Sequence, residues 1–414
     1  METKKGRITT IQDLGDDLMV KIISWLPLKS IVLCLGVCKQ WQSLISDGPF
    51  FLTNTINVAH RHYDDTYICH RRCQRGGGIQ DSELPFSIKS LDKSLFAQVY
   101  DGGILAGPPI YDYGIFATCN GLLIYGVFIR STKELRECYI SNPWTREYVP
   151  FEKPSYPRPI AGWGLAFENN PINSNSRNSN SSSRNNAALY EIVVVHYKFE
   201  NQTYLFEVCS SDKKRWQLIQ SAIKFCYPRL NNNAVYCRRV LYWQCCEKQA
   251  LIFNLETETP DYLELPRDTD NNHAMAHRFH KSKLVECHGQ LHCLQTSSGG
   301  SRLSIWKMST TMSHGWLLLH NVDLGGVVER NLDVLDPEHK TKNNLLLAFS
   351  PIDMNCEGDD KVLFDCVYLF NYNYCMIVSY DLKRAVFELI LKRESCQELK
   401  FFRYTPTNKT ISER

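Results

Sequence analysis

The sequence predicts a mainly β protein that begins with a small helical domain and continues as a β-propeller of about six blades, within a range of six to eight. Three observations predict this fold class. Apolar residues recur at helical spacing only near the amino terminus, apolar strands fill the rest of the chain, and one strand–turn–strand unit recurs there. The 414 residues, 43% hydrophobic and 22% charged, suffice for one large all-β domain plus a small one.

The helical stretch, residues 14–45, reads LGDDLMVKIISWLPLKSIVLCLGVCKQWQSLI and predicts three short helices. Pro27 ends the first helix, and Ser30 is placed to cap the second. A domain of this size rarely stabilises itself alone, so its apolar surplus either packs on the larger domain or docks another protein. The apolar stripe of the first helix contains Leu18, Met19, Ile22, Trp25 and Leu26.

The strand-rich region repeats a unit made of an apolar strand, a polar turn and a second strand opened by an aromatic residue. The spacing approaches the roughly 40–50 residues of a four-stranded blade once the Asn/Ser-rich stretch 169–186 is removed, and this stretch is predicted to be a disordered loop at a blade rim. A β-sandwich or two small β domains remain alternatives, although more than 300 residues exceed a single sandwich. The aromatic residues are Tyr148, Trp216, Tyr262, Trp316 and Phe387.

Two stretches contain donor atoms for a metal, but neither has a standard ligand spacing. The second also lacks the glutamate of an H-E-x-x-H site, and no phosphate-binding or nucleophile-elbow motif occurs in its required context. We therefore expect no cofactor, no metal and no catalytic residue, and the sequence does not decide whether the first stretch binds a metal. The donors are His60, His62, Cys69, His70 and Cys73 in the first stretch and His273, His277 and His280 in the second.

The charge and the termini bear on compartment and partners. A formal net charge of +3 predicts neither a nucleic-acid nor a membrane partner. The polar amino terminus predicts no signal peptide, and no stretch reaches the roughly 18 apolar residues of a spanning helix. The 17 cysteines are accordingly expected to be reduced, in a cytoplasmic or nuclear protein.

The helical stretch resembles an F-box, which implies binding to a Skp-type adaptor and through it to a cullin and a RING protein. Gly15 stands where the family usually has proline. The resemblance rests on Leu14, Asp16, Asp17, Leu18, Ile22, Leu26, Pro27, Lys29, Ser30, Val37, Cys38, Lys39, Trp41 and Leu44. The residues expected to bind the adaptor are Leu14, Leu18, Ile22, Leu26, Pro27, Val37, Cys38, Trp41 and Leu44.

The strand-rich region resembles the plant-type F-box-associated domain, which implies a β-propeller. A kelch propeller is the nearby alternative, but the three diglycines at 102–103, 299–300 and 325–326 have no constant period. The predicted organisation is a flexible amino terminus at 1–9, an F-box at 10–50, the propeller at 51–404 and a flexible tail at 405–414. The motif residues are Cys119, Asn120, Gly121, Leu122, Leu123, Asn142, Pro143, Thr145 and Arg146.

Together these resemblances imply the non-catalytic substrate-recognition subunit of a Skp–cullin–F-box ubiquitin ligase, whose propeller binds a protein for ubiquitination and proteasomal degradation. Two alternatives are an adaptor-binding scaffold that escorts cargo without ubiquitinating it, and a propeller hydrolase with a helical appendage. The sequence does not identify the substrate, its modification or the adaptor paralogue. Rim-loop residues around Trp163, Arg229 and His314 are the candidates for substrate contact.

Overall fold

A computed structural model divides the chain into two compact units, Met1–Asp65 and Thr66–Arg414. In the first unit the structure describes residues 15, 18, 19, 22, 34 and 37–41. In the second it describes 66–71, 86–90, 111–129, 131–132, 134–142, 147–168, 188–224, 230, 233–246, 248–266, 281–297, 302–309, 315–331, 335, 347–355, 361–368, 375–393, 399–403, 407, 409 and 411. The predicted loop 169–186 lies outside these residues.

Most of the described residues of the first unit are helical, namely 18, 19, 22, 34 and 39–41. The backbone N–H groups of Leu18 and Met19 both donate to the carbonyl oxygen of Gly15, at 3.0 and 3.1 Å. Gly15 therefore lies at the start of the first helix, and Ile22 lies one turn after Leu18. A Cβ atom on Gly15 would meet none of the described atoms within 4 Å.

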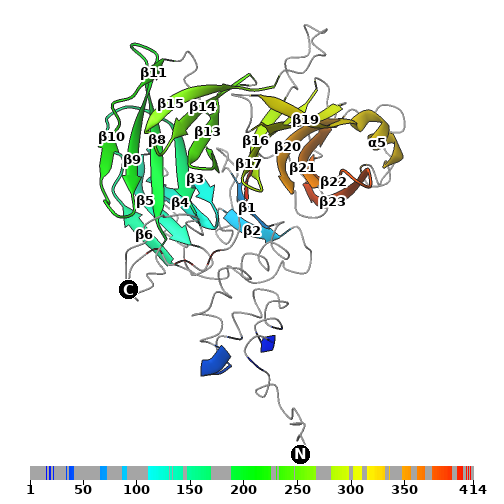
Figure 1. Ribbon diagram of the computed structural model, residues 1–414, viewed down its shortest axis with the longest axis horizontal. Coiled ribbons are helices and arrows are strands. Elements are labelled where there is room, and N and C mark those ends of the chain that lie inside the picture. Colours follow the sequence, from blue (N-terminus) through cyan, green and yellow to red (C-terminus); the bar gives the residue numbers. More distant parts are fainter. Residues whose placement is uncertain are drawn as a thin grey trace, which may run out of the picture. The chain divides into compact units, whose positions relative to one another are not determined.

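The second unit contains five sheets of four or five antiparallel strands, named here the first to fifth blades in chain order (Figure 1). The first blade contains β3 (Tyr111–Cys119), β4 (Leu122–Ile129), β5 (Leu135–Asn142) and β6 (Glu147–Phe151). The second contains β7 (Ile160–Phe167), β8 (Tyr190–Lys198), β9 (Thr203–Ser210), β10 (Trp216–Leu218) and β11 (Ile223–Lys224). The third contains β12 (Val235–Cys237), β13 (Val240–Gln244), β14 (Gln249–Asn254) and β15 (Thr259–Glu264).

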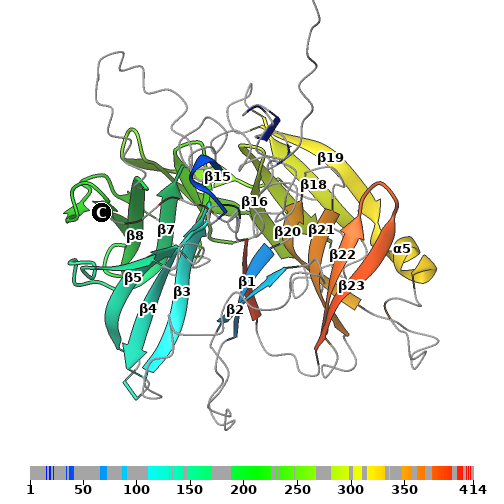
Figure 2. The same cartoon turned by 90° about the horizontal axis from the view of Figure 1, so that it is seen from below.

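The remaining blades follow the same order of strands. The fourth contains β16 (Lys281–Cys287), β17 (Gln290–Thr296), β18 (Arg302–Met308) and β19 (Trp316–Asp323), after which comes the helix α5 (Leu324–Arg330). The fifth contains β20 (Leu347–Asn355), β21 (Lys361–Tyr368), β22 (Cys375–Asp381) and β23 (Val386–Arg393). The first strands β3, β7, β12, β16 and β20 contact one another in this order, so they form the inner layer (Figure 2).

A sixth sheet joins the two ends of the second unit. It has three strands in the order β2 (Phe86–Ser90), β1 (Thr66–Arg71) and β24 (Leu399–Arg403). Tyr67 of β1 pairs with Arg403 of β24, and β24 also contacts β3 of the first blade. We name it the closing sheet.

The mainly β fold predicted from the sequence is confirmed, but the blade count is corrected. The described residues form five blades of four or five strands instead of about six, and the closing sheet has only three. Among the described residues before the first blade, β1 and β2 belong to the closing sheet, and its third strand comes from the carboxyl end. The five repeated aromatic residues give the number of these blades, because they lie one each on the outer strands β6, β10, β15, β19 and β23.

Three of the outer aromatic residues also form hydrogen bonds between neighbouring blades. Trp216 of the second blade donates its indole N–H to the carbonyl oxygen of Glu152, which follows the first blade, at 2.6 Å. Tyr262 of the third blade donates to Lys224 O at 2.7 Å, and Trp316 of the fourth blade donates to Glu264 O at 2.8 Å. Each such bond satisfies a polar group at the tip of a large apolar ring.

Apolar side chains fill the spaces between blades. Trp243 is 0% exposed and donates its indole N–H to Trp163 O at 2.9 Å. Gly162 and Gly164 of β7 make room for it, since a Cβ on either would come within 3.0 Å of the Trp243 ring. Trp163 is buried as well and stacks on Phe116 at 4.4 Å between ring centroids. Trp163 is therefore a core residue, which corrects its prediction as a rim-loop candidate.

The carboxyl end of the chain is bound to the first blade. The side-chain amide of Asn142 donates to Thr407 O at 2.8 Å and to Lys409 O at 2.7 Å. The backbone N–H of Ile411 donates to a carboxylate oxygen of Glu147 at 2.9 Å. The sequence predicts a flexible tail over 405–414, yet these three described tail residues are held by Asn142 and Glu147.

The described cysteines are mostly free, as expected. Nine of them are unpaired, and burial raises the pKa of Cys237 and Cys138 to about 12, which keeps their thiols protonated. Cys287 is an exception because it is buried and disulfide-bonded, which corrects the expectation of wholly reduced cysteines. A disulfide depends on the distance between two Cα atoms in the fold, which cysteine spacing in the sequence does not reveal.

Candidate functional site

The helical unit exposes apolar side chains that the sequence assigns to adaptor binding. Leu18 is 54% exposed, Ile22 is 41% exposed and Val37 is 61% exposed. Leu18 and Ile22 are four residues apart on a helix, so they lie on the same face. We refer to the three exposed residues Leu18, Ile22 and Val37 together as the apolar face of the helical unit.

Other apolar residues of this unit are buried. Met19 is 1% exposed and Cys34 is 8% exposed, so the first helix directs Met19 away from the solvent-exposed face of Leu18. Cys38 and Trp41 are half-buried, and the backbone N–H of Trp41 contacts the Cys38 sulfur at 3.5 Å. The predicted stripe is thus divided between an interior side and an exposed side. Four other predicted adaptor-binding residues lie outside the described part of the unit: Leu14, Leu26, Pro27 and Leu44.

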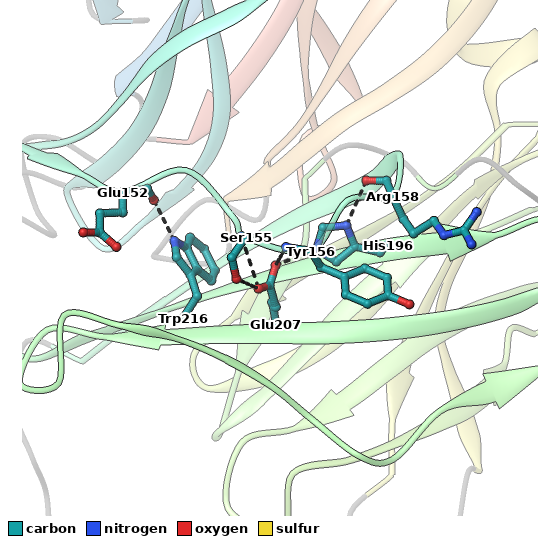
Figure 3. Close-up of polar contacts among 7 residues, drawn as sticks. All are labelled: Glu152, Ser155, Tyr156, Arg158, His196, Glu207 and Trp216. Carbon is teal, nitrogen blue, oxygen red and sulfur yellow. Dashed lines mark hydrogen bonds and ion pairs between the residues drawn. The ribbon is translucent and has the colours of Figure 1, made fainter.

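A buried polar cluster lies in the second blade, where it meets the segment 152–159 that leads from β6 to β7 (Figure 3). We call this segment the strap. The side chains of His196 on β8 and Glu207 on β9 are each 1% exposed, and His196 Nε2 lies 2.9 Å from Glu207 Oε2. The other ring nitrogen of His196 lies 3.1 Å from the carbonyl oxygen of Arg158 in the strap. Glu207 also accepts hydrogen bonds from the hydroxyl of Ser155 at 2.6 Å and from the backbone of Tyr156 at 3.3 Å.

This cluster contains serine, histidine and glutamate, but not in the order of a nucleophilic triad. The Ser155 hydroxyl is bonded to Glu207, which lies between Ser155 and His196 (Figure 3). A serine nucleophile needs the histidine within hydrogen-bond reach as its base. The arrangement instead holds the strap against the second blade by side-chain and main-chain bonds.

A second polar region is formed by the turns between the first and second strands of three blades. The turns are Asn120–Gly121, Arg238–Arg239 and His288–Gly289, and all six residues have positive φ. Such turns fit the twist of a hairpin and favour Asn-Gly or a similar pair. The third blade instead has two arginines in the left-handed region, at φ 49° and 63°, each of which costs about 1 kcal/mol or more.

Contacts join these turns into one rim that runs from the first blade to the fourth. The Asn120 amide donates to Phe167 O at the end of β7 at 2.7 Å. Arg239 forms an ion pair of 2.7 Å with Glu191 on β8. The Arg238 Nε atom lies 3.8 Å from the position that a Cβ on Gly289 would take, so Arg238 extends to the fourth blade.

Most charges on this rim have partners. The Tyr236 hydroxyl donates to Glu168, and burial together with this bond raises the pKa of Tyr236. Glu286 accepts the backbone N–H of Gly289 at 2.6 Å. Arg238 is exposed and makes no ion pair or hydrogen bond within the described part of the chain. This rim was not predicted from the sequence, although two arginines at a hairpin position that favours glycine were a visible signal.

No potential metal site occurs among the described residues, in the sense that no three His, Cys, Asp or Glu side chains gather there. No described helix has the length and apolar character needed to cross a bilayer. Several predicted candidates cannot be placed. Cys69 and His70 belong to β1 but their side chains are not described, and His60, His62, Cys73, Arg229, His273, His277, His280 and His314 lie outside the described residues.

The chain was compared with protein families and with individual proteins. Residues 11–53 match the F-box domain, and residues 89–413 match the family described as F-box protein At3g26010-like, beta-propeller. Two Arabidopsis thaliana proteins are similar over most of their length. F-box protein At5g07610 is 24% identical over 88% of this chain and 84% of that protein, and F-box protein At5g49610 is 22% identical over 78% and 81%.

Solved structures give only a distant likeness. A Lactobacillus plantarum protein aligns with 81% of this chain and 99% of its own at 10% identity, with a TM-score of 0.38. The family match, in contrast, covers more than half of the chain and agrees with the observed sheets. An F-box region with an exposed apolar face is thus followed by a propeller, and the chain belongs to the F-box protein At3g26010-like β-propeller family.

Proposed function

We propose that this chain is the substrate-recognition subunit of a Skp–cullin–F-box ubiquitin ligase. In this proposal the F-box binds a Skp-type adaptor, which links it to a cullin and a RING protein. The propeller holds a protein substrate, and ubiquitin transfer takes place on other subunits, so the chain itself is not an enzyme. The protein works in the cytoplasm or the nucleus, where such a ligase and the proteasome operate.

The exposed apolar face of the helical unit is the observation that carries the proposal. Leu18, Ile22 and Val37 are each more than two-fifths exposed, within the region that matches an F-box. Exposed apolar residues gathered on a small helical domain are typical of a protein–protein interface. Burial of such a side chain by a partner contributes roughly 1.5–3 kcal/mol, which corresponds to a ten- to hundredfold change in affinity.

The adaptor interaction can be tested with one variant and a matched control in the full chain. Val37→Asp places a charge on the apolar face, whereas Val386→Asp places the same charge at an exposed valine of the propeller that is 44% exposed. We expect Val37→Asp to weaken adaptor binding at least tenfold in biolayer interferometry. Val386→Asp should bind as the unchanged protein does, and an equal loss in both variants would contradict the assignment.

Degradation of cargo separates a ligase subunit from an escort that binds cargo without ubiquitinating it. Proteins that co-purify with the full chain are identified in cells with and without proteasome inhibition. For a ligase subunit, such a cargo accumulates under inhibition, and it also accumulates when Val37→Asp replaces the unchanged chain. A cargo whose level is constant in both experiments favours the escort.

A further inference from the structure

We propose that Arg238 is a binding site for an anionic side chain, carboxylate or phosphate, on the protein substrate. The proposal rests on the substrate-receptor function above and names the chemistry that the propeller selects. Arg238 occupies the exposed end of the hairpin between β12 and β13, on the rim that joins the first four blades. The site is therefore open to a protein segment that lies across these turns.

The charge of Arg238 is not neutralised by its surroundings. The neighbouring Arg239 is engaged by Glu191 at 2.7 Å, while Arg238 has no ion pair with a carboxylate in the described chain. Glu286 lies on β16, next to the turn of the fourth blade, and it accepts the Gly289 N–H at 2.6 Å. Glu286 raises and Arg238 lowers the pKa of the Cys237 thiol, so both charges lie near that thiol.

The backbone of this turn indicates a role beyond folding. The equivalent turns of the first and fourth blades have glycine at their second position, whereas here two arginines take left-handed φ values. Among the described residues this is the one pair of consecutive non-glycine residues in that region. Strained backbone of this kind is concentrated at functional sites, where the surrounding structure maintains it. The ion pair with Glu191 explains the position of Arg239, but Arg238 has no such partner among the described residues.

The guanidinium group determines the class of ligand. It is planar, permanently charged and presents N–H donors in a fork that fits two oxygen atoms of one carboxylate or phosphate. Arg238 extends to the turn of the fourth blade, with its Nε 3.8 Å from the Cβ position of Gly289. The oxygen atoms of an acidic or phosphorylated side chain would be bound between the third and fourth blades.

Binding can be measured with the full chain and three fluorescent peptides of alternating glycine and one test residue: serine, glutamate or phosphoserine. We expect the glutamate or the phosphoserine peptide to bind in fluorescence anisotropy, with the serine peptide at least tenfold weaker. Preference for glutamate identifies a carboxylate ligand, and preference for phosphoserine identifies a phosphate. Arg238→Gln should weaken acidic-peptide binding about tenfold, and Arg238→Lys should weaken it less because charge remains without the fork.

Arg384→Gln is the matched control, because Arg384 lies in the exposed β22–β23 turn with its side chain 74% exposed. It should change binding less than twofold. Arg238→Gly relieves the backbone constraint, so it should keep or raise Tm while losing peptide binding. The proposal is overturned if neither acidic peptide binds, or if Arg384→Gln weakens binding as much as Arg238→Gln. Adaptor binding is measured on the same samples. If the adaptor binds but the acidic peptides do not, only the Arg238 proposal fails, whereas loss of adaptor binding would count against the receptor function itself.

Discussion

The two units of the chain treat apolar side chains in opposite ways. In the propeller, Trp243 and Phe253 are completely buried between blades. In the helical unit, Leu18 and Val37 are more than half exposed. The propeller therefore completes its core with its own residues, whereas the helical unit leaves apolar surface that another protein can cover. The difference indicates that apolar side chains of the propeller stabilise its own fold, whereas those of the helical unit are available to a binding partner.

The largest expected effect tests this contrast directly. Trp243→Ala should lower the free energy of unfolding by about 3–5 kcal/mol, since it removes a buried ring and leaves a cavity next to Gly162 and Gly164. Val37→Ala should change it by less than about 0.5 kcal/mol because the side chain is exposed. Urea unfolding of the full chain, followed by circular dichroism, compares the two. A cost for Val37→Ala near that of Trp243→Ala would place Val37 in a core.

A smaller effect concerns the bonds that join the blades. Trp316→Phe keeps an aromatic ring but removes the N–H that donates to Glu264 O at 2.8 Å, so it should cost about 1 kcal/mol. Tyr148→Phe is the control, because Tyr148 is 53% exposed on the outer strand of the first blade and forms no hydrogen bond with a described residue of a neighbouring blade. Thermal unfolding should show a lower Tm for Trp316→Phe alone. Equal Tm values would mean that these bonds add nothing to the packing of the rings.

The smallest effect is a dependence of propeller stability on pH. Burial lowers the pKa of His292 below its ordinary value of 6.5. A hydrogen bond with Gln290 O raises this pKa, and the nearby Lys307 and His288 lower it to a smaller extent. The unfolded chain then binds the proton more readily than the folded chain. The contribution of neutral His292 to stability is fully present above pH 6.5 and is lost as pH falls from there toward the folded-state pKa. His292→Gln should reduce this decrease, as Tm measurements across that range would show, and an unchanged slope would contradict the assignment to His292.

The sequence predicted the two-part organisation because the relevant signals are local. Hairpin turns such as Asn120–Gly121 and the aromatic residues that open the outer strands depend on a few adjacent positions. The repeated aromatic residues predicted a propeller of about six blades, whereas the described residues form five, and the repeat did not reveal the hydrogen bonds to the preceding blade. The apolar stripe 18–26 predicted a helix, and its described residues 18, 19 and 22 are helical. Periodicity alone, however, did not distinguish the buried Met19 from the exposed Leu18.

The features that the sequence did not predict depend on contacts between distant segments. The closing sheet requires β24 to return to β1, and the buried pair His196–Glu207 is bonded to the strap that connects the first and second blades. Trp163 was predicted to be a rim-loop residue, yet it lies in the interior. The rim around Arg238 required the positions of three blades at once, which one-dimensional spacing does not contain.

The closing sheet also sets the order of events during synthesis. Its first strand, β1, leaves the ribosome early, whereas its partner β24 is almost the last segment to be made, because Tyr67 pairs with Arg403. At roughly 5–20 residues per second the delay is on the order of half a minute. Throughout this time the F-box region has already emerged and the ring of blades has not been joined. A newly made chain can therefore present its F-box region before its propeller is complete.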